Sequence, residues 1–183
     1  MSYANLISIG RLLCVPLFIW LCLTDHMEEA FWVFCIAGAS DFLDGLLARL
    51  LKERTQLGAF LDPLADKALL VGAFVTLSVL GLVPLWLVIL VVFRDVLIVA
   101  GSLLILLFDK ELSIEPLFIS KLNTAAQIAL LALLLGLAAL GETQPLLANT
   151  MIWIVGVTTF LSGAFYVKLW IKMMNQESAS GKS

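Results

Sequence analysis

The stretch that decides the fold is LWLVILVVFRDVLIVAGSLLILLF, residues 85–108. Apart from the neighbouring pair Arg94 and Asp95, it contains no charged residue. A helix needs about 20 consecutive apolar residues to cross the hydrocarbon core of a bilayer. The stretch therefore predicts a membrane-spanning helix that carries one pair of opposite charges.

Five further apolar segments, each bounded by turn or charge signals, lie on either side of this stretch. They run from about Ile7 to Leu23, Ala30 to Leu51, Phe60 to Leu80, Leu122 to Leu140 and Leu147 to Met173. Together the six segments predict an all-α integral membrane protein with six transmembrane helices, in a single domain over residues 1–174. Residues 175–183 are polar and are expected to form a disordered tail.

The composition excludes a water-soluble protein. Of 183 residues, 62% are hydrophobic and 14% are charged, and the mean hydropathy is +1.07. Soluble domains are about 45–50% apolar and about 25% charged, and a chain of this size cannot bury so much apolar surface. The net charge of −3 also excludes nucleic acid as a partner, because its binding needs a basic face.

The distribution of basic residues predicts how the helices are oriented. Basic residues follow the second segment (Lys52 and Arg54) and the fourth segment (Lys110 and Lys121), and the C-terminal end adds Lys168, Lys172 and Lys182. The connections after the first, third and fifth segments contain neither Lys nor Arg. Because basic loops stay on the cytoplasmic side, both termini are expected in the cytoplasm. No transit peptide is recognised, which favours a bacterial inner membrane with the active site on its cytoplasmic side.

Four carboxylates surround one predicted cytoplasmic loop: Asp41, Asp44, Asp62 and Asp66. Spacings of three and four residues place each pair on one face of its helix, and a short loop would bring the two pairs together. A carboxylate in an apolar span is costly unless it is paired, hydrated or bound to a cation. Oxygen ligands indicate Mg²⁺, Mn²⁺ or Ca²⁺ rather than zinc. The alternative is an internal ion-pair network with Arg49, Lys67 and Arg94.

Small residues and a cation accompany these carboxylates. Gly45 and Ala48 leave the helix surface open to a flat group or a phosphate, and Gly58 gives a flexible approach to the third segment. Arg49 supplies a fixed cation at the cytoplasmic edge, suited to a phosphate. Metal ions beside an arginine are typical of phosphoryl transfer, where catalysis consists of charge neutralisation and alignment.

The pattern D-x2-D-G-x2-A-R-x8-G-x3-D-x3-D, matched from Asp41 to Asp66 without a departure, resembles the signature of the CDP-alcohol phosphatidyltransferases. The predicted topology, with six spans and both termini in the cytoplasm, is also similar to the topology of that family. The resemblance implies two divalent ions, Mg²⁺ or Mn²⁺, on the four aspartates, with Asp66 also the base that takes the proton from the acceptor hydroxyl. It implies that the CDP moiety of CDP-diacylglycerol lies against six residues: Asp41, Gly45, Ala48, Arg49, Gly58 and Asp62.

Within the family, the chain resembles the branch that holds the single-domain cardiolipin synthases and the phosphatidylglycerolphosphate synthases. The start at residues 5–12 and the stretch 62–67 are shared by both groups. Asp95 after Arg94, and the stretch 118–127, favour the first group, which transfers phosphatidyl to phosphatidylglycerol and forms cardiolipin and CMP. Asn123 stands where the second group more usually has a lysine that a glycerol 3-phosphate dianion would use. Glycerol 3-phosphate is the alternative acceptor.

Five side chains are predicted to bind the acceptor or a lipid phosphate: Arg11, Arg94, Lys121, Asn123 and Gln127. Each has a structural alternative. For Arg94 it is a local salt bridge with Asp95, and for Asn123 and Gln127 it is hydrogen bonding between helices. Lys121 is alternatively a cytoplasmic anchor, and Arg11 alternatively extends to the membrane interface.

Two other function classes compete with a transferase, namely a cation-coupled membrane transporter and an inactive structural membrane subunit. The transporter is disfavoured because the carboxylates cluster toward one face and the second and third segments contain no signal for a helix broken in mid-membrane. A homodimer is expected from the family. Patches of small residues at 37–40 and 162–164 allow close helix contact, either between two copies or within one chain.

Overall fold

The computed structural model describes the backbone of residues 3–51, 56–107 and 118–180, and the side chains of residues 10–40, 67–100, 119–168 and 171. Within these ranges the chain forms six α-helices and no strand. The helices are α1 (Tyr3–Leu23), α2 (Met27–Leu51), α3 (Gln56–Val79), α4 (Leu85–Leu107), α5 (Phe118–Ala139) and α6 (Pro145–Ser180). Each helix covers one predicted segment, so the prediction of an all-α fold with six helices is confirmed.

Helix α6 is longer than the sequence led us to expect. Its predicted end was Met173, with a disordered tail over 175–183, whereas the helix continues to Ser180. Residues 174–180 contain neither glycine nor proline, and the next residue, Gly181, is the first helix-breaking one. Because extending an existing helix adds one hydrogen bond for each residue fixed, polar residues propagate it without an apolar face.

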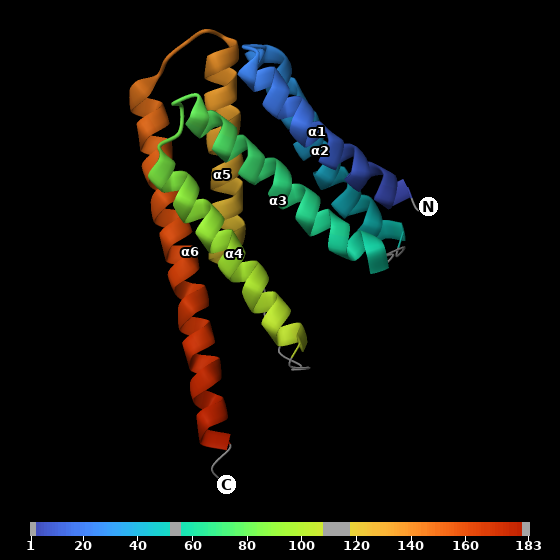
Figure 1. Ribbon diagram of the computed structural model, residues 1–183, viewed down its shortest axis with the longest axis vertical. Coiled ribbons are helices and arrows are strands. Elements are labelled where there is room, and N and C mark those ends of the chain that lie inside the picture. The colour runs from blue at the N-terminus through green and yellow to red at the C-terminus, as the bar shows by residue number, and fades with distance from the viewer. Residues whose placement is uncertain (1–2, 52–55, 108–117, 181–183) are drawn as a thin grey trace.

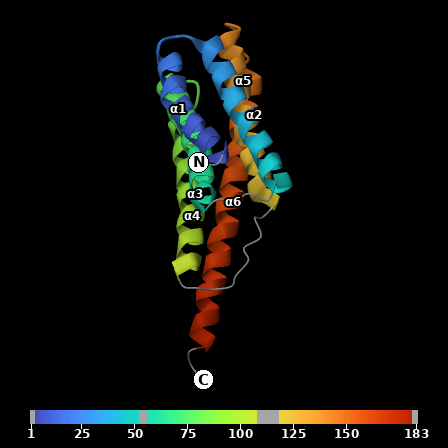
Figure 2. The same ribbon diagram turned by 90° about the vertical axis from the view of Figure 1, so that its right-hand side faces the viewer.

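The helices alternate in direction along the chain, and Figure 1 shows the three turns α1–α2, α3–α4 and α5–α6 at the same end. In this view α1 begins at the right, away from the turns, and α6 ends at the bottom. Helix α1 packs on α2 and α3, and α6 packs on α4 and α5. These two groups meet where α5 contacts α2 and α3, and where α3 contacts α4. In Figure 2 the long α6 extends beyond the other five helices toward its C-terminal end.

The three turns share one helix-ending geometry. Asp25, Gly81 and Gly141 have positive φ angles of 65°, 77° and 66°. In the first turn the N–H of His26 donates to the carbonyl of Leu21 at 2.9 Å, and the other two turns contain the same bond. This Schellman ending satisfies carbonyl groups that would otherwise lack a partner. Glycine adopts the left-handed conformation without steric cost, whereas Asp25 holds it with a side chain.

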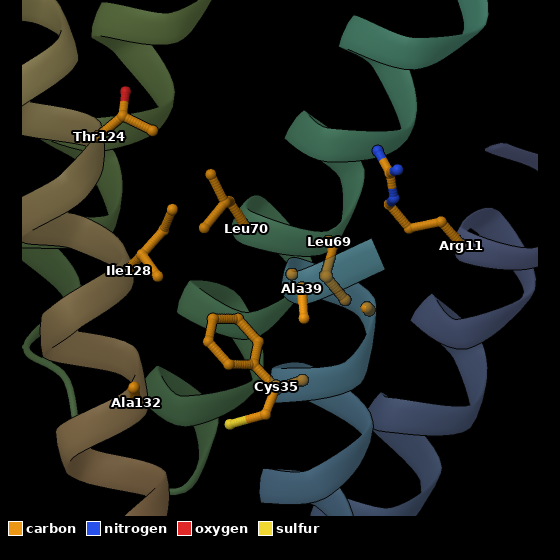
Figure 3. Close-up of a pocket in the computed structure, with 11 residues that line it drawn as sticks. Arg11, Cys35, Ala39, Leu69, Leu70, Thr124, Ile128 and Ala132 are labelled. Carbon is orange, nitrogen blue, oxygen red and sulfur yellow. The ribbon is translucent and has the colours of Figure 1, made fainter. Parts of the chain in front are cut away.

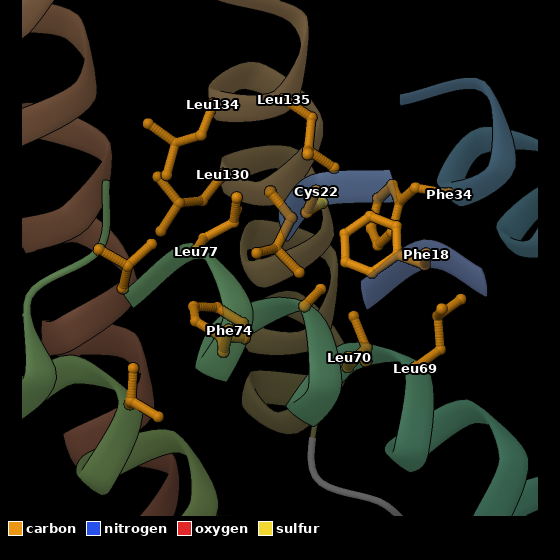
Figure 4. Close-up of a cluster of buried hydrophobic side chains, with 14 of the residues drawn as sticks. Phe18, Cys22, Phe34, Leu69, Leu70, Phe74, Leu77, Leu130, Leu134 and Leu135 are labelled. Atoms are coloured by element: carbon orange, nitrogen blue, oxygen red, sulfur yellow. The ribbon is translucent and has the colours of Figure 1, made fainter. Parts of the chain in front are cut away.

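The apolar core takes side chains from all six helices, and Figure 4 labels the part where α3 and α5 meet α1 and α2. Phe74 of α3 and Leu130 and Leu135 of α5 are fully buried. Phe18 of α1 packs against Phe34 of α2, with ring centroids 6.1 Å apart. This packing fixes the positions of the two helices, α2 and α3, that carry the predicted carboxylates.

The outer surface is apolar in the manner of a membrane protein. Helical stretches Ile119–Ala139 and Pro145–Lys168 are long and apolar enough to cross a bilayer, and shorter apolar stretches occur at Gly10–Leu23 and Lys67–Val79. Four exposed tryptophans belong to the half of the bundle that carries the three turns: Trp20, Trp32, Trp86 and Trp153. Tryptophan is enriched at membrane–water interfaces, so this end has the composition of one membrane boundary.

Candidate active site

The predicted metal and CDP residues lie in the C-terminal half of α2 and the N-terminal half of α3. Helix α2 carries Asp41, Asp44, Gly45, Ala48 and Arg49, and helix α3 carries Gly58, Asp62 and Asp66. The backbone is helical at all of these positions, so each carboxylate pair shares one face of its helix. The end of α2 and the start of α3 lie on the same side of the bundle in Figure 1. Side chains 41–66 lie outside the described residues, and their roles stay predictions.

The donor set at these positions fits a hard divalent cation. Four aspartates on two helices supply only carboxylate oxygens, which Mg²⁺ and Mn²⁺ prefer. Among the side chains that are described, no group of three or more His, Cys, Asp or Glu residues forms a second candidate. The four aspartates are therefore the site that we consider for a metal.

Lys67, which follows Asp66 in α3, forms an ion pair with helix α4. Its Nζ lies 2.6 Å from Oδ2 of Asp95. The side chain of Lys67 is 30% exposed and that of Asp95 is 7% exposed, so the pair lies at the edge of the interior, where charges attract more strongly than in water. Asp95 thus connects α4 to α3 one residue beyond the predicted base.

Arg94 is almost completely buried and is bonded on all sides. Its Nη1 lies 2.8 Å from Oδ1 of Asp95. Its Nε and Nη2 donate to Oγ of Ser162 on α6 at 3.1 and 3.0 Å, and Nη2 also donates to Oγ of Ser120 on α5. The local salt bridge considered for Arg94 and Asp95 is therefore present. In addition, the guanidinium joins α4 to α5 and α6, while its predicted role toward the acceptor stays a prediction.

Asn123 and Gln127 lie one turn apart on α5 and both bond to α6. Oδ1 of Asn123 accepts hydrogen bonds of 2.8 Å from the hydroxyls of Thr158 and Thr159. Nε2 of Gln127 donates to Oγ1 of Thr159 at 3.4 Å. The alternative of hydrogen bonding between helices is thus confirmed for both. Nδ2 of Asn123 and Oε1 of Gln127 are buried without a hydrogen-bond partner, so one donor and one acceptor remain for a ligand or a water molecule.

Arg11 borders a different feature, a cavity of about 330 Å³ between α1, α2, α3 and α5 (Figure 3). Arg11 is 4% exposed. The wall is otherwise mostly apolar and includes Ala39 of α2 and Leu69 and Leu70 of α3. Because these residues lie within a turn or so of Asp41 and Asp66 along their helices, the cavity adjoins the carboxylate motif. Thr124 lines its α5 side.

The five predicted acceptor residues do not form one cluster. Arg11 lies against the α1–α2–α3 group, whereas Arg94, Asn123 and Gln127 lie between α4, α5 and α6. Lys121 is exposed on the first turn of α5. The sequence did not single out the hydroxyl partners as site residues: Ser120, Thr158, Thr159 and Ser162.

Within the second small-residue patch, at 162–164, Ser162 is engaged inside the chain because it accepts from Arg94. Gly163 packs near the same side chain, since a Cβ at this glycine would lie 3.8 Å from Cγ of Arg94. This patch therefore provides a contact between α6 and α4. The expected homodimer stays a prediction.

The chain is similar to known proteins over most of its length. A family model described as CDP-alcohol phosphatidyltransferase matches residues 1–161. A fission yeast protein named "Cardiolipin synthase (CMP-forming) / mitochondrial hydrolase fusion protein" is 35% identical over 177 residues, which is 88% of this chain and 30% of that protein.

Two further relatives have different names, of which the first contains the acceptor glycerol 3-phosphate and the second the product cardiolipin. A rice protein named "CDP-diacylglycerol--glycerol-3-phosphate 3-phosphatidyltransferase 1, chloroplastic" is 34% identical over 91% of this chain and 56% of its own length. A human protein named "Cardiolipin synthase (CMP-forming)" is 34% identical over 70% of this chain and 48% of its own length. The chain thus spans from about a third to just over half of these three relatives.

Proposed function

Because the chain belongs to the CDP-alcohol phosphatidyltransferase family, we propose that it transfers the phosphatidyl group of CDP-diacylglycerol to phosphatidylglycerol. The products are cardiolipin and CMP. The observation that carries the proposal is the complete motif from Asp41 to Asp66 on α2 and α3. The names of the fission yeast and human relatives support it.

In this proposal the four aspartates hold two Mg²⁺ or Mn²⁺ ions, which when bound neutralise the diphosphate and improve CMP as a leaving group. Asp66 takes the proton from the hydroxyl of phosphatidylglycerol. That oxygen forms a bond to the phosphatidyl phosphorus, while the bond from this phosphorus to the CMP oxygen breaks. Arg49 pairs with a phosphate, and Gly45, Ala48 and Gly58 allow the CDP moiety to lie close to the helix backbones.

The surroundings of the motif suit a lipid substrate. The mostly apolar cavity beside α2 and α3 accepts an acyl chain, and Arg11 at its wall supplies a cation for a lipid phosphate. We place all six helices across the membrane with both termini and the motif on the cytoplasmic side, because the opposite end carries the turns without Lys or Arg. A bacterial inner membrane stays the predicted location.

The environment of Asn123 favours phosphatidylglycerol over glycerol 3-phosphate. A glycerol 3-phosphate dianion needs cations at its binding site, and position 123 holds a neutral amide that is fully buried and bonded to α6. Its unbonded N–H suits a neutral hydroxyl of the larger acceptor. Glycerol 3-phosphate is the second candidate, because the name of the rice relative contains it.

The test uses purified protein with CDP-diacylglycerol and Mg²⁺ or Mn²⁺, and offers phosphatidylglycerol or glycerol 3-phosphate in parallel. Released CMP and the lipid products are identified by mass spectrometry. We expect cardiolipin and CMP only with phosphatidylglycerol, and no turnover by the folded variant Asp66→Asn. If product forms only with glycerol 3-phosphate, glycerol 3-phosphate replaces phosphatidylglycerol as the proposed acceptor. Transport of a cation without CMP release would overturn the proposed transferase activity.

A further inference from the structure

Three charged side chains form a continuous chain of contacts that starts beside the predicted base. Lys67 of α3 contacts Asp95 of α4, and Asp95 contacts Arg94. We call this set the Lys67–Asp95–Arg94 chain. It belongs neither to the carboxylate motif nor to the CDP residues.

At the Arg94 end of the Lys67–Asp95–Arg94 chain, hydrogen bonds to two other helices hold the guanidinium in place. The guanidinium is 2% exposed and donates to Ser120 on α5 and Ser162 on α6. Arginine presents its N–H groups in a rigid plane, so these serines also fix the direction of the bond to Asp95. Oδ1 of Asp95 then accepts from Arg94, and Oδ2 forms an ion pair with Lys67 that lacks hydrogen-bond geometry.

The Lys67 end lies next to Asp66 in the same helical turn. An ion pair at the tip of the Lys67 side chain favours the helix rotations in which its flexible four-carbon stem still reaches Asp95. The position of Asp95 therefore restrains the rotation of the α3 turn that carries Asp66. A displacement of about 1 Å of a reacting group is enough to reduce a rate about 100-fold.

We propose that Asp95 is a positioning residue for phosphatidyl transfer: by holding Lys67, it sets the orientation of the α3 turn that bears Asp66. This inference rests on the proposed function. Asp95 touches neither substrate nor metal in this scheme, and its effect on Asp66 passes through Lys67. An alternative is that the pair merely adds stability.

A double-mutant cycle separates these two roles. The variants are Asp95→Asn, Lys67→Met and their combination, with Glu142→Gln as the matched control, because Glu142 is an exposed carboxylate in the distant α5–α6 turn. All are assayed with whichever acceptor the wild-type protein uses, and kcat and KM are measured separately. Thermal unfolding is recorded for each, and turnover is measured well below every midpoint.

For Asp95→Asn we expect kcat to fall about 10- to 100-fold, the usual cost of losing a residue that orients a functional group, with KM for CDP-diacylglycerol little changed. In the Lys67→Met background the same substitution should change kcat by less than about twofold, because the contact is already lost. Asp95→Glu, which keeps the charge, should recover part of the rate.

Two results would overturn the inference while wild-type turnover stands. One is a kcat of Asp95→Asn equal to that of Glu142→Gln, and the other is a full, additive loss in the double variant. If Asp95→Asn does not fold, Asp95→Glu and Lys67→Met provide the test instead. A wild-type kcat in both of these folded variants would also overturn the inference that Asp95 is a positioning residue. Absence of CMP release by the wild-type protein with either acceptor would instead overturn the proposed function.

Discussion

Replacing Arg94 with methionine tests whether this side chain joins α4 to α5 and α6. The substitution keeps a long, flexible side chain and removes the ion pair with Asp95 and the hydrogen bonds to Ser120 and Ser162. Breaking a buried ion pair by removing one partner costs about 3–5 kcal/mol. Lys67 remains beside Asp95 and still neutralises it, so we expect the lower end, about 3 kcal/mol.

The corresponding change is measurable by thermal unfolding. In a chain of this size, 1 kcal/mol shifts the unfolding midpoint by about 2–4 °C, so Arg94→Met should lower Tm by about 6–12 °C. Intrinsic tryptophan fluorescence of the purified protein in detergent gives the midpoint. Arg94→Lys, which keeps the charge but loses the planar fork, should fall between wild type and Arg94→Met.

Lys168→Met is the control for this prediction, because it removes an exposed cation from α6. Exposed substitutions of this kind change stability by no more than about 0.5 kcal/mol. If Arg94→Met lowers Tm no more than Lys168→Met does, the bonds of the buried guanidinium do not hold the three helices together, and the reasoning is refuted.

Three further predictions concern helix packing, a turn and the metal. A Cβ at Gly156 would lie 2.8 Å from Cη2 of Trp86, whereas a Cβ at Gly163 meets nothing closer than 3.8 Å. Gly156→Ala should therefore be less stable than Gly163→Ala by about 1–3 kcal/mol, and equal midpoints would contradict this. Asp25→Gly should raise stability by about 1 kcal/mol because it relieves a positive φ of 65°, and an unchanged or lower Tm would count against that strain. Excess EDTA should abolish CMP release and added Mg²⁺ or Mn²⁺ should restore it, so turnover that persists in EDTA would exclude the metal-dependent mechanism.

The helical framework could be predicted from the sequence because it depends on local signals. Long apolar runs bounded by turn residues predicted all six helices, and Gly81 and Gly141 are such turn residues in two of the connections. The left-handed residue of the first turn carries no such signal, since it is Asp25 rather than glycine. The predicted end of α6 at Met173 was also wrong. The polar residues after Met173 were expected to stop the helix, but neither glycine nor proline interrupts it before residue 181.

The candidate site was predictable only in part. Arg94 and Asp95 are neighbours, so their salt bridge could be anticipated from the sequence. Ser162 lies 68 residues from Arg94 and Ser120 lies 26 residues away, and no periodicity relates such positions. The contact of Lys67 with Asp95 likewise depends on how α3 and α4 pack. Sequence patterns show which residues share a helix face, whereas these partners are selected by tertiary packing.

The pairing of Arg94 with its own neighbour has a consequence for how the protein is made. In the proposed six-span topology, helix α4 enters the bilayer before α5 and α6 are synthesised, so neither Ser120 nor Ser162 is available to Arg94 at that moment. Arginine and aspartate near a helix centre each add about 2.5–3.5 kcal/mol to the cost of insertion. Because Asp95 lies 2.8 Å from the guanidinium within the same helix, α4 carries its own counter-ion across. When α5 and α6 pack against α4, Ser120 and Ser162 accept hydrogen bonds from a guanidinium that Asp95 already neutralises.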